Sequence, residues 1–167
     1  CGVQHGELAA DRVAKTIEFY LGVFGRHSKL SLDQVRERAR GYAGQIAAID
    51  SAIMAEIEGI AAGSKQMLED IVAVNCRTEL MYGASRGSRA ATECTTIVAL
   101  PEATRDHGVI VGKNWDWRSP ALHSVVLLRI RQSAKPALSL IVEAGMVGRD
   151  GFNEHGIVVC GNMLTSS

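Results

Sequence analysis

The sequence has no apolar run long enough to cross a membrane. A spanning helix needs about 20 consecutive apolar residues, and no such stretch occurs in the 167 residues. The basic and then apolar layout of a secretory signal is absent as well. We therefore expect no membrane partner and a cytoplasmic location.

An excess of charge of one sign is also missing. Lys and Arg number 18, as do Asp and Glu, so the formal net charge is +0. Proteins that bind the phosphates of nucleic acids carry an excess of basic charge, so we expect no nucleic-acid partner. What the chain has is apolar sequence for a packed core, since 47% of its residues are hydrophobic and 22% are charged.

The cysteines and histidines lack the spacing of a metal site. No zinc-type pair or cluster occurs, and we expect neither a metal nor another cofactor. The four cysteines are scattered, and in a chain of this size reduced thiols fit them better than disulfides. We interpret the five histidines as surface or turn residues. The cysteines are Cys1, Cys76, Cys94 and Cys160, and the histidines are His5, His27, His107, His123 and His155.

Apolar residues recur at helical spacing through the first half of the chain. The pattern predicts helices over residues 8–24, 31–57 and 64–82, with Gly25 as the stop of the first. Ser31 is of the residue type that caps the start of a helix. The first half is therefore predicted to be helical.

The second half changes to short β-branched runs between turn signals. A small, polar and basic segment at residues 84–92 precedes them and has the composition of an exposed loop. The runs that predict strands are residues 95–100, 108–112, 124–130, 138–142 and 156–160. Helices followed by antiparallel strands indicate an α+β fold.

Cys94 stands where the helical half gives way to the strands. If the Glu93–Cys94 peptide bond were cut, the freed α-amino group, with a pKa of about 7.7–8.0, would act as the base for the Cys94 thiol. The thiol could make that cut itself by attacking the Glu93 carbonyl. A free cysteine is more often packing material, and position alone leaves that interpretation open.

Ordered motifs around Cys94 resemble those of one family. They are HG (5–6), NCRTELMYG (75–83), CTTIVALP (94–101), GKNWDW (112–117), RIRQ (129–132), EAGMVG (143–148) and GFNEHG (151–156). Together they resemble the acyl-coenzyme A:6-aminopenicillanic acid acyltransferase family, which is peptidase C45-like and has the N-terminal-nucleophile (Ntn) hydrolase fold.

The resemblance implies a four-layer sandwich of two antiparallel sheets between helical layers, of which this chain holds a part. Residues 1–93 would form the helical α-part and residues 94–167 the start of the β-part, within one structural domain. It further implies an autoproteolytic cysteine acyltransferase or amidohydrolase. The enzyme would act on a small-molecule amide or acyl thioester, acyl-coenzyme A included, through a thioester acyl-enzyme. The two parts would remain associated after cleavage, and an oligomer is left open.

Carried over by motif, Cys94 matches the nucleophile of a cleavage site between Glu93 and Cys94. Asp116 matches an acidic residue beside it, and a carboxylate there would orient the freed ammonium. Asn162 follows the last run, where the wider superfamily places part of its oxyanion hole. Lys113 stands where related penicillin V acylases and bile salt hydrolases have Arg, so it is either a substrate contact or a solvated hairpin lysine.

Two further pairs belong to the matched motifs. Trp115 and Trp117 alternate along a predicted strand, so one is expected in the core while the other, Trp117 among the candidates, lines a substrate pocket. Arg77 and Glu79 lie on the third predicted helix, and we interpret them as a structural ion pair that braces the helix against the sheet.

Two alternatives stay open. An uncleaved, non-catalytic or incomplete family member would act as a binding or structural module, and this is favoured by Glu93, where the penicillin acyltransferase has Gly. A thiol redox role is the other, although no paired-cysteine motif supports it. We expect the family's remaining catalytic residues, an oxyanion Asn and a Ser/Arg pair, in sequence beyond Ser167.

Overall fold

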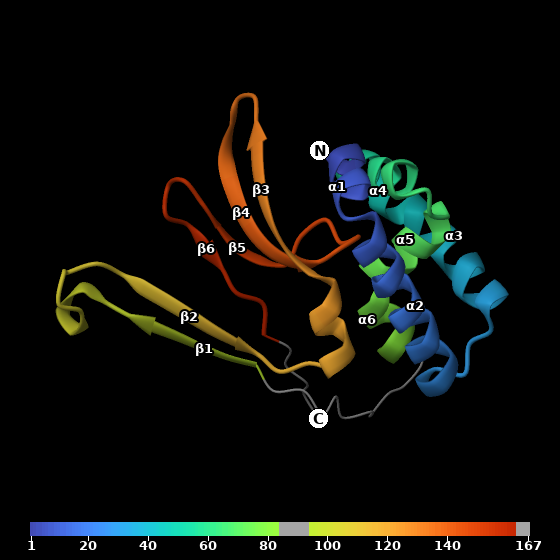
Figure 1. Cartoon of the computed structure of the whole chain (residues 1–167), viewed down its shortest axis with the longest axis horizontal. Coiled ribbons are helices and arrows are strands. Elements are labelled where there is room, and N and C mark those ends of the chain that lie inside the picture. Colours follow the sequence, from blue (N-terminus) through green and yellow to red (C-terminus); the bar gives the residue numbers. More distant parts are fainter. Residues whose placement is uncertain (84–93, 163–167) are drawn as a thin grey trace.

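The computed structural model describes residues 1–83 and 94–162. Helices make up the first range and strands most of the second, and Figure 1 shows the two groups side by side. The helices are α1 (Gly2–Leu8), α2 (Ala10–His27), α3 (Leu32–Ile49), α4 (Ser51–Ser64), α5 (Leu68–Asn75) and α6 (Arg77–Tyr82). Within the described ranges, none of them combines the length and the apolar character needed to cross a membrane.

Each of the three predicted helices is divided or shifted. Ser31 caps α3 as expected, because its hydroxyl accepts from Gln34 N and the Gln34 side chain accepts from Ser31 N in a capping box. The helix then stops at Asp50, whose carboxylate accepts from Ala52 N at 2.8 Å and caps α4. The prediction of one helix over residues 31–57 was wrong because Asp50 offers the backbone this alternative partner.

The other two predictions fail in similar ways. The first predicted helix, residues 8–24, corresponds to α2, which begins after a break at Ala9 and runs through Gly25 to His27 rather than stopping, and α1 before that break was not predicted. The third is α5 and α6 with a break at Cys76. A glycine inside a helix lowers its stability only modestly, so Gly25 alone does not end α2.

The strands form two antiparallel sheets, which confirms the α+β class. One sheet pairs β1 (Cys94–Ala99) with β2 (Ile110–Trp115), and the other has the order β3–β4–β5–β6. The members of the second sheet are β3 (Val125–Gln132), β4 (Lys135–Glu143), β5 (Asp150–Asn153) and β6 (Val158–Val159). Two short 3₁₀ helices, η1 (Pro101–Ala103) and η2 (Ser119–Ser124), connect them. β5 was not predicted, since its sequence DGFN reads as a turn, and the predicted loop at residues 84–92 lies outside the described residues.

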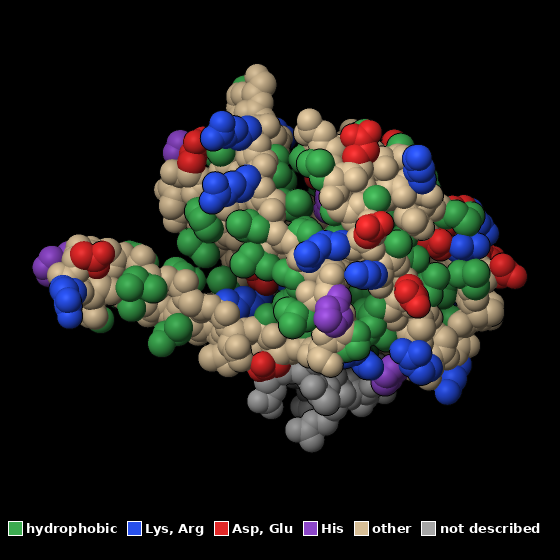
Figure 2. Space-filling model, viewed as in Figure 1, with side chains coloured by type: hydrophobic (Ala, Val, Ile, Leu, Met, Phe, Trp, Pro, Cys, Tyr) green, Lys and Arg blue, Asp and Glu red, His purple; other side chains and the backbone are tan. Residues whose placement is uncertain are grey.

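One face of the four-stranded sheet packs on the helices. Val142 is fully buried against this layer, whereas its neighbour Ile141 is 52% exposed, as expected when successive side chains point to opposite faces. The core joins both halves of the chain and includes Val13, Tyr20, Phe24, Ile57, Ile71, Leu80, Val142 and Met146. The β1–β2 hairpin extends away from this core, and Figure 2 shows apolar side chains exposed along it.

Helices α1 and α4 approach so closely that glycine is required at their contact. A Cβ added at Gly63 of α4 would lie against the carbonyl oxygen of Val3 in α1, nearer than real Cβ atoms come. The same holds for Gly6 of α1 against the backbone of Ile60. The two backbones therefore touch directly, and the spacing depends on the missing side chains.

We expect Gly63→Ala to lower the free energy of unfolding by about 1–3 kcal/mol, because the helices must move apart. Gly44→Ala is the matched control: an exposed glycine inside α3 with nothing within 4 Å of its added Cβ. It should raise stability by up to about 1 kcal/mol through helix propensity. Urea unfolding of both variants provides the measurement, and equal effects would show that the close contact does not hold in solution.

Candidate active site

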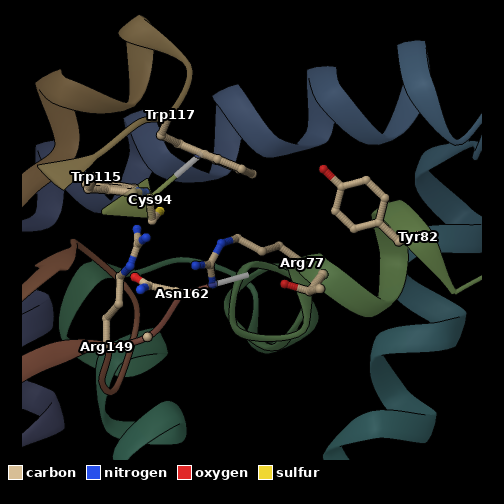
Figure 3. Close-up of a pocket in the computed structure, with 9 residues that line it drawn as sticks. Arg77, Tyr82, Cys94, Trp115, Trp117, Arg149 and Asn162 are labelled. Carbon is tan, nitrogen blue, oxygen red and sulfur yellow. The ribbon is translucent and has the colours of Figure 1, made fainter. Parts of the chain in front are cut away.

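Cys94 opens into a cavity between the two halves of the molecule. It is the first residue of β1, is half-buried, and pairs in register with Trp115 at the end of β2. The cavity measures about 340 Å³. The described residues that line it are Arg77, Thr78, Tyr82, Cys94, Trp115, Trp117, Arg149, Gly161 and Asn162. Figure 3 shows the Arg77 and Arg149 guanidinium groups directed into the same space as the Cys94 sulfur.

A buried carboxylate lies behind this cavity. Glu143, the last residue of β4, has no exposed surface. The Tyr20 hydroxyl of α2 lies 2.9 and 3.0 Å from its two carboxylate oxygens, and Arg77 Nε of α6 is 3.8 Å from Oε2. Burial raises the pKa of Glu143, while Arg77, the Tyr20 hydrogen bond and Arg149 act in the opposite direction. One side chain thus joins two helices to the end of a strand.

Trp117 connects the cavity wall to the same group. Its Nε1 donates to the Tyr20 hydroxyl at 2.9 Å, and its ring packs against the core. Trp117 lies two residues beyond the end of β2, so the two tryptophans do not alternate along one strand as predicted. Trp115 and Trp117 both line the cavity, whereas only one of them was expected there.

Arg149 is held in the cavity wall by contacts on several sides. Its guanidinium carbon lies 3.6 Å from the centre of the Trp115 ring, and its Nε is 3.2 Å from the Asp150 carboxylate. Its Nη1 is buried, lies 4.0 Å from Glu143 Oε2 and has no hydrogen-bond partner in the described part of the chain. Burial lowers the Arg149 pKa, and Arg77 lowers it further. Nothing in the sequence singled out Arg149, although the EAGMVG motif ends immediately before it.

Lys113 does not line the cavity but fixes a segment that does. Its ammonium donates to the Asp150 carboxylate at 2.7 Å and to the Gly161 carbonyl oxygen. The same Asp150 oxygen accepts from Gly161 N at 2.8 Å. Because its side chain is only 8% exposed, Lys113 is not the solvated hairpin lysine considered above. It ties β2 to the chain beyond β6 and so positions the next residue, Asn162.

Of the two predicted polar residues Asn162 and Asp116, only Asn162 lines the cavity. Asn162 Oδ1 accepts from the Thr96 hydroxyl at 3.2 Å, and this residue lines the cavity. Asp116 is exposed, accepts from Asn114 Nδ2 at 2.9 Å, and is not among the cavity walls. Asp116 directly follows Trp115, which pairs with Cys94, and the predicted cleavage site includes the residue that precedes Cys94. That residue, Glu93, lies outside the described residues.

The predicted pair of Arg77 and Glu79 is wrong in its acidic member. Glu79 is exposed at the surface of α6, and the ion-pair partner of Arg77 is Glu143. The two motif residues are two positions apart on a short helix and therefore face different ways. The signal for the true partner was an acid that ends the largely apolar run LSLIV, since such a position is often buried.

His5 was also misjudged, because it is buried rather than at the surface. Its Nε2 accepts from Gly145 N at 3.1 Å, so its Nδ1 carries the proton. Asn75 completes the grip on this turn, since its amide donates to Gly145 O at 2.8 Å and accepts from Val147 N at 3.0 Å. Gly145 has φ +98, a conformation suited to glycine. The turn that leads from Glu143 to Arg149 is therefore fastened to α1 and α5.

Among the residues that the structure describes, neither disulfides nor clustered metal ligands occur near the cavity. All four cysteines are free thiols, and burial raises the pKa of Cys76 to about 11. In residues 1–83 and 94–162, no group of three or more His, Cys, Asp or Glu side chains is placed to hold a metal ion.

Comparison with known proteins finds a relative that matches nearly the whole chain. The chain is 31% identical over 163 residues to the acyl-coenzyme A:6-aminopenicillanic-acid-acyltransferase 40 kDa form of Emericella nidulans. The match covers 98% of this chain and 44% of that protein, so the chain spans less than half the length of its relative. No protein-family model matches the chain.

Removing the buried carboxylate should cost much more stability than removing a surface one. We expect Glu143→Ala to lower the free energy of unfolding by about 3 kcal/mol or more, because Arg77 and Arg149 lose their shared counter-charge. Glu69→Ala is the control, since Glu69 pairs with Arg40, which is 60% exposed. That change should cost less than about 1 kcal/mol. Similar losses in guanidinium unfolding of the two variants would contradict the central position of Glu143.

Proposed function

We propose, since this chain is a relative of the acyl-coenzyme A:6-aminopenicillanic acid acyltransferase family, that it carries the nucleophile of an acyltransferase. The nucleophile would be Cys94, freed as a new N-terminus by cleavage of the Glu93–Cys94 bond. The observation that carries this proposal is the position of Cys94. Its thiol opens into the cavity lined by two arginines, two tryptophans and an amide, at the first residue of a strand.

The cut would proceed through the Cys94 thiol. The sulfur attacks the Glu93 carbonyl carbon, and the peptide C–N bond breaks as the S–C bond of a thioester forms. The nitrogen keeps its own proton, gains the thiol proton and becomes the α-amino group of Cys94. Water then hydrolyses the thioester, which leaves a carboxylate on Glu93 and returns the thiol.

The freed amine would serve as the base in the acyl transfer that follows. It accepts the thiol proton while the sulfur attacks the acyl carbon of an amide or thioester, and it returns that proton to the leaving group. A thioester acyl-enzyme results, and the acyl group passes to water or to an amine. The β1–β2 register supports a role for Asp116 beside this amine, because both would lie at the same end of the strand pair.

Asn162 is the candidate donor for the oxyanion of the tetrahedral intermediate. Its Oδ1 is engaged by Thr96, while its Nδ2 group makes no hydrogen bond to the described residues. It lies on the cavity wall with Cys94, and Lys113 holds the preceding residue in place. An amide fixed in this way is suited to stabilise developing negative charge without reorganising.

The fold agrees with the proposal at a coarser level. Two antiparallel sheets and a helical layer are compatible with part of an Ntn sandwich, and the complete four-layer arrangement belongs to the proposal. Cleavage before Cys94 would divide the chain into residues 1–93 and 94–167. The buried core contains residues from both sides of that point, such as Tyr20, Phe24, Val142 and Met146. The two parts would therefore stay associated.

The proposal predicts self-cleavage that depends on one thiol. Expression of the full gene that encodes this chain should give two fragments, the second beginning at Cys94, as measured by intact mass and N-terminal sequencing. Cys94→Ala should remain a single chain, because no other group can make the N-to-S shift. Cys160→Ala, which removes another half-buried free thiol, should be cleaved as the wild type is. A single uncut chain for all three proteins, or a new N-terminus elsewhere, would leave the family member as an uncleaved binding module.

A further inference from the structure

The cavity beside Cys94 contains more positive than negative charge. Three cations, Arg77, Arg149 and Lys113, are joined by ion pairs to two carboxylates, Glu143 and Asp150. Lys113 and Asp150 are 2.7 Å apart and neutralise each other most directly. Two guanidinium groups then remain against a single buried carboxylate, from which they are separated by 3.8 and 4.0 Å. One positive charge of this cluster is left without a counter-charge among the described residues.

The unmatched charge has a defined direction. The Arg149 Nε pairs with the Asp150 carboxylate, and one face of its guanidinium plane stacks on the Trp115 ring. Stacking fixes the plane and leaves the edge that carries the Nη groups for a ligand. Its buried Nη1 has no hydrogen-bond partner in residues 1–83 and 94–162. Burying such a donor costs free energy that an incoming acceptor would recover.

The β1–β2 pairing brings Arg149 close to Cys94. Trp115, on which Arg149 stacks, is the residue directly opposite Cys94 in the β1–β2 pair. Figure 3 shows the Arg149 and Arg77 guanidinium groups near Cys94, with Asn162 beside the Arg149 side chain. An anion bound by Arg149 would lie in the same cavity as an acyl group on Cys94.

We propose that Arg149, assisted by Arg77, forms a subsite that binds a carboxylate of the substrate next to Cys94. This assignment rests on the proposed function for its catalytic meaning and deepens it. The substrate class becomes amides or thioesters that carry a carboxylate close to the scissile carbonyl. A planar carboxylate suits the guanidinium edge, and a single negative charge matches the single unmatched positive charge.

Alkylation of Cys94 by iodoacetate and iodoacetamide tests the subsite without requiring any turnover. The two reagents have similar size, and in both the thiolate displaces iodide, but only iodoacetate carries a carboxylate. Peptide mass mapping gives the rate at Cys94, and the iodoacetate-to-iodoacetamide ratio is compared with that of N-acetylcysteine and of Cys160. We expect the ratio at Cys94 to be about tenfold higher or more, because a charge-assisted contact holds the carboxylate.

Variants connect the preference to the arginine. Arg149→Gln should abolish the raised ratio, and Arg149→Lys should keep part of it, since the charge remains but the planar fork is lost. Arg131→Gln removes an exposed arginine of β3 and should change nothing. Circular dichroism melting identifies any variant that fails to fold. If Arg149→Gln does fail, the Arg149→Lys ratio and the protection of wild-type Cys94 by acetate decide the question.

Several results would overturn the subsite. They are a ratio at Cys94 equal to that of the reference thiols, no alkylation of Cys94 by either reagent, and a raised ratio that survives in Arg149→Gln. Stronger protection by inorganic phosphate than by acetate at equal concentration would assign the anion site to phosphate and contradict the carboxylate. A raised ratio in a protein that neither cleaves itself nor accepts an acyl group would retain the subsite and remove only the proposed function.

Discussion

The Glu143 carboxylate sits at the end of β4 with no exposed surface, and the arrangement of the cavity depends on it. Tyr20 brings α2 to this group, Arg77 brings α6, and Arg149 approaches from the turn beyond. A buried charge is costly unless its partners are in place. The helical half and the strand half are therefore held in one relative position, with Cys94 at their common cavity.

The same set of contacts explains why the cavity is both rigid and charged. Trp117 is fixed through Tyr20, and Arg149 through Trp115 and Asp150. Lys113 extends the network to the segment that carries Asn162. Side chains whose orientation is set by surrounding contacts lose little entropy when a ligand binds. The cavity thus presents positive charge and an amide to whatever reaches the Cys94 thiol.

The sequence was sufficient for features that depend on local pattern. Helical spacing followed by β-branched runs predicted the α+β class, Ser31 was placed at a helix start, and the ordered motifs predicted a resemblance that the 31% identity to the fungal acyltransferase supports. The breaks at Asp50 and Cys76 were missed because hydrophobic periodicity continues across them. At Asp50 the break is set by a side-chain cap, which periodicity does not record, whereas Cys76 makes no side-chain cap hydrogen bond.

Features that depend on distant partners could not be predicted in the same way. Glu79 and Glu143 are the same residue type, so the sequence alone does not tell them apart. Only Glu143 ends a strand that packs on α2, and its Tyr20 partner is 123 residues away. His5 has a polar side chain whose partner, Gly145 N, lies 140 residues away. Arg149 follows a recognised motif without any pattern of its own. Its role becomes visible only when the β1–β2 register places Trp115 beneath it.

The account rests on Cys94 as the nucleophile, and trapping of its acyl group is the most direct measurement. The full-length protein would be mixed with 4-nitrophenyl acetate, quenched in acid within milliseconds, digested and mapped by mass spectrometry. The account predicts one acetyl group per protein, on the peptide that begins at Cys94. An acetyl group on another residue, or an unchanged burst of 4-nitrophenol from Cys94→Ala, would contradict it.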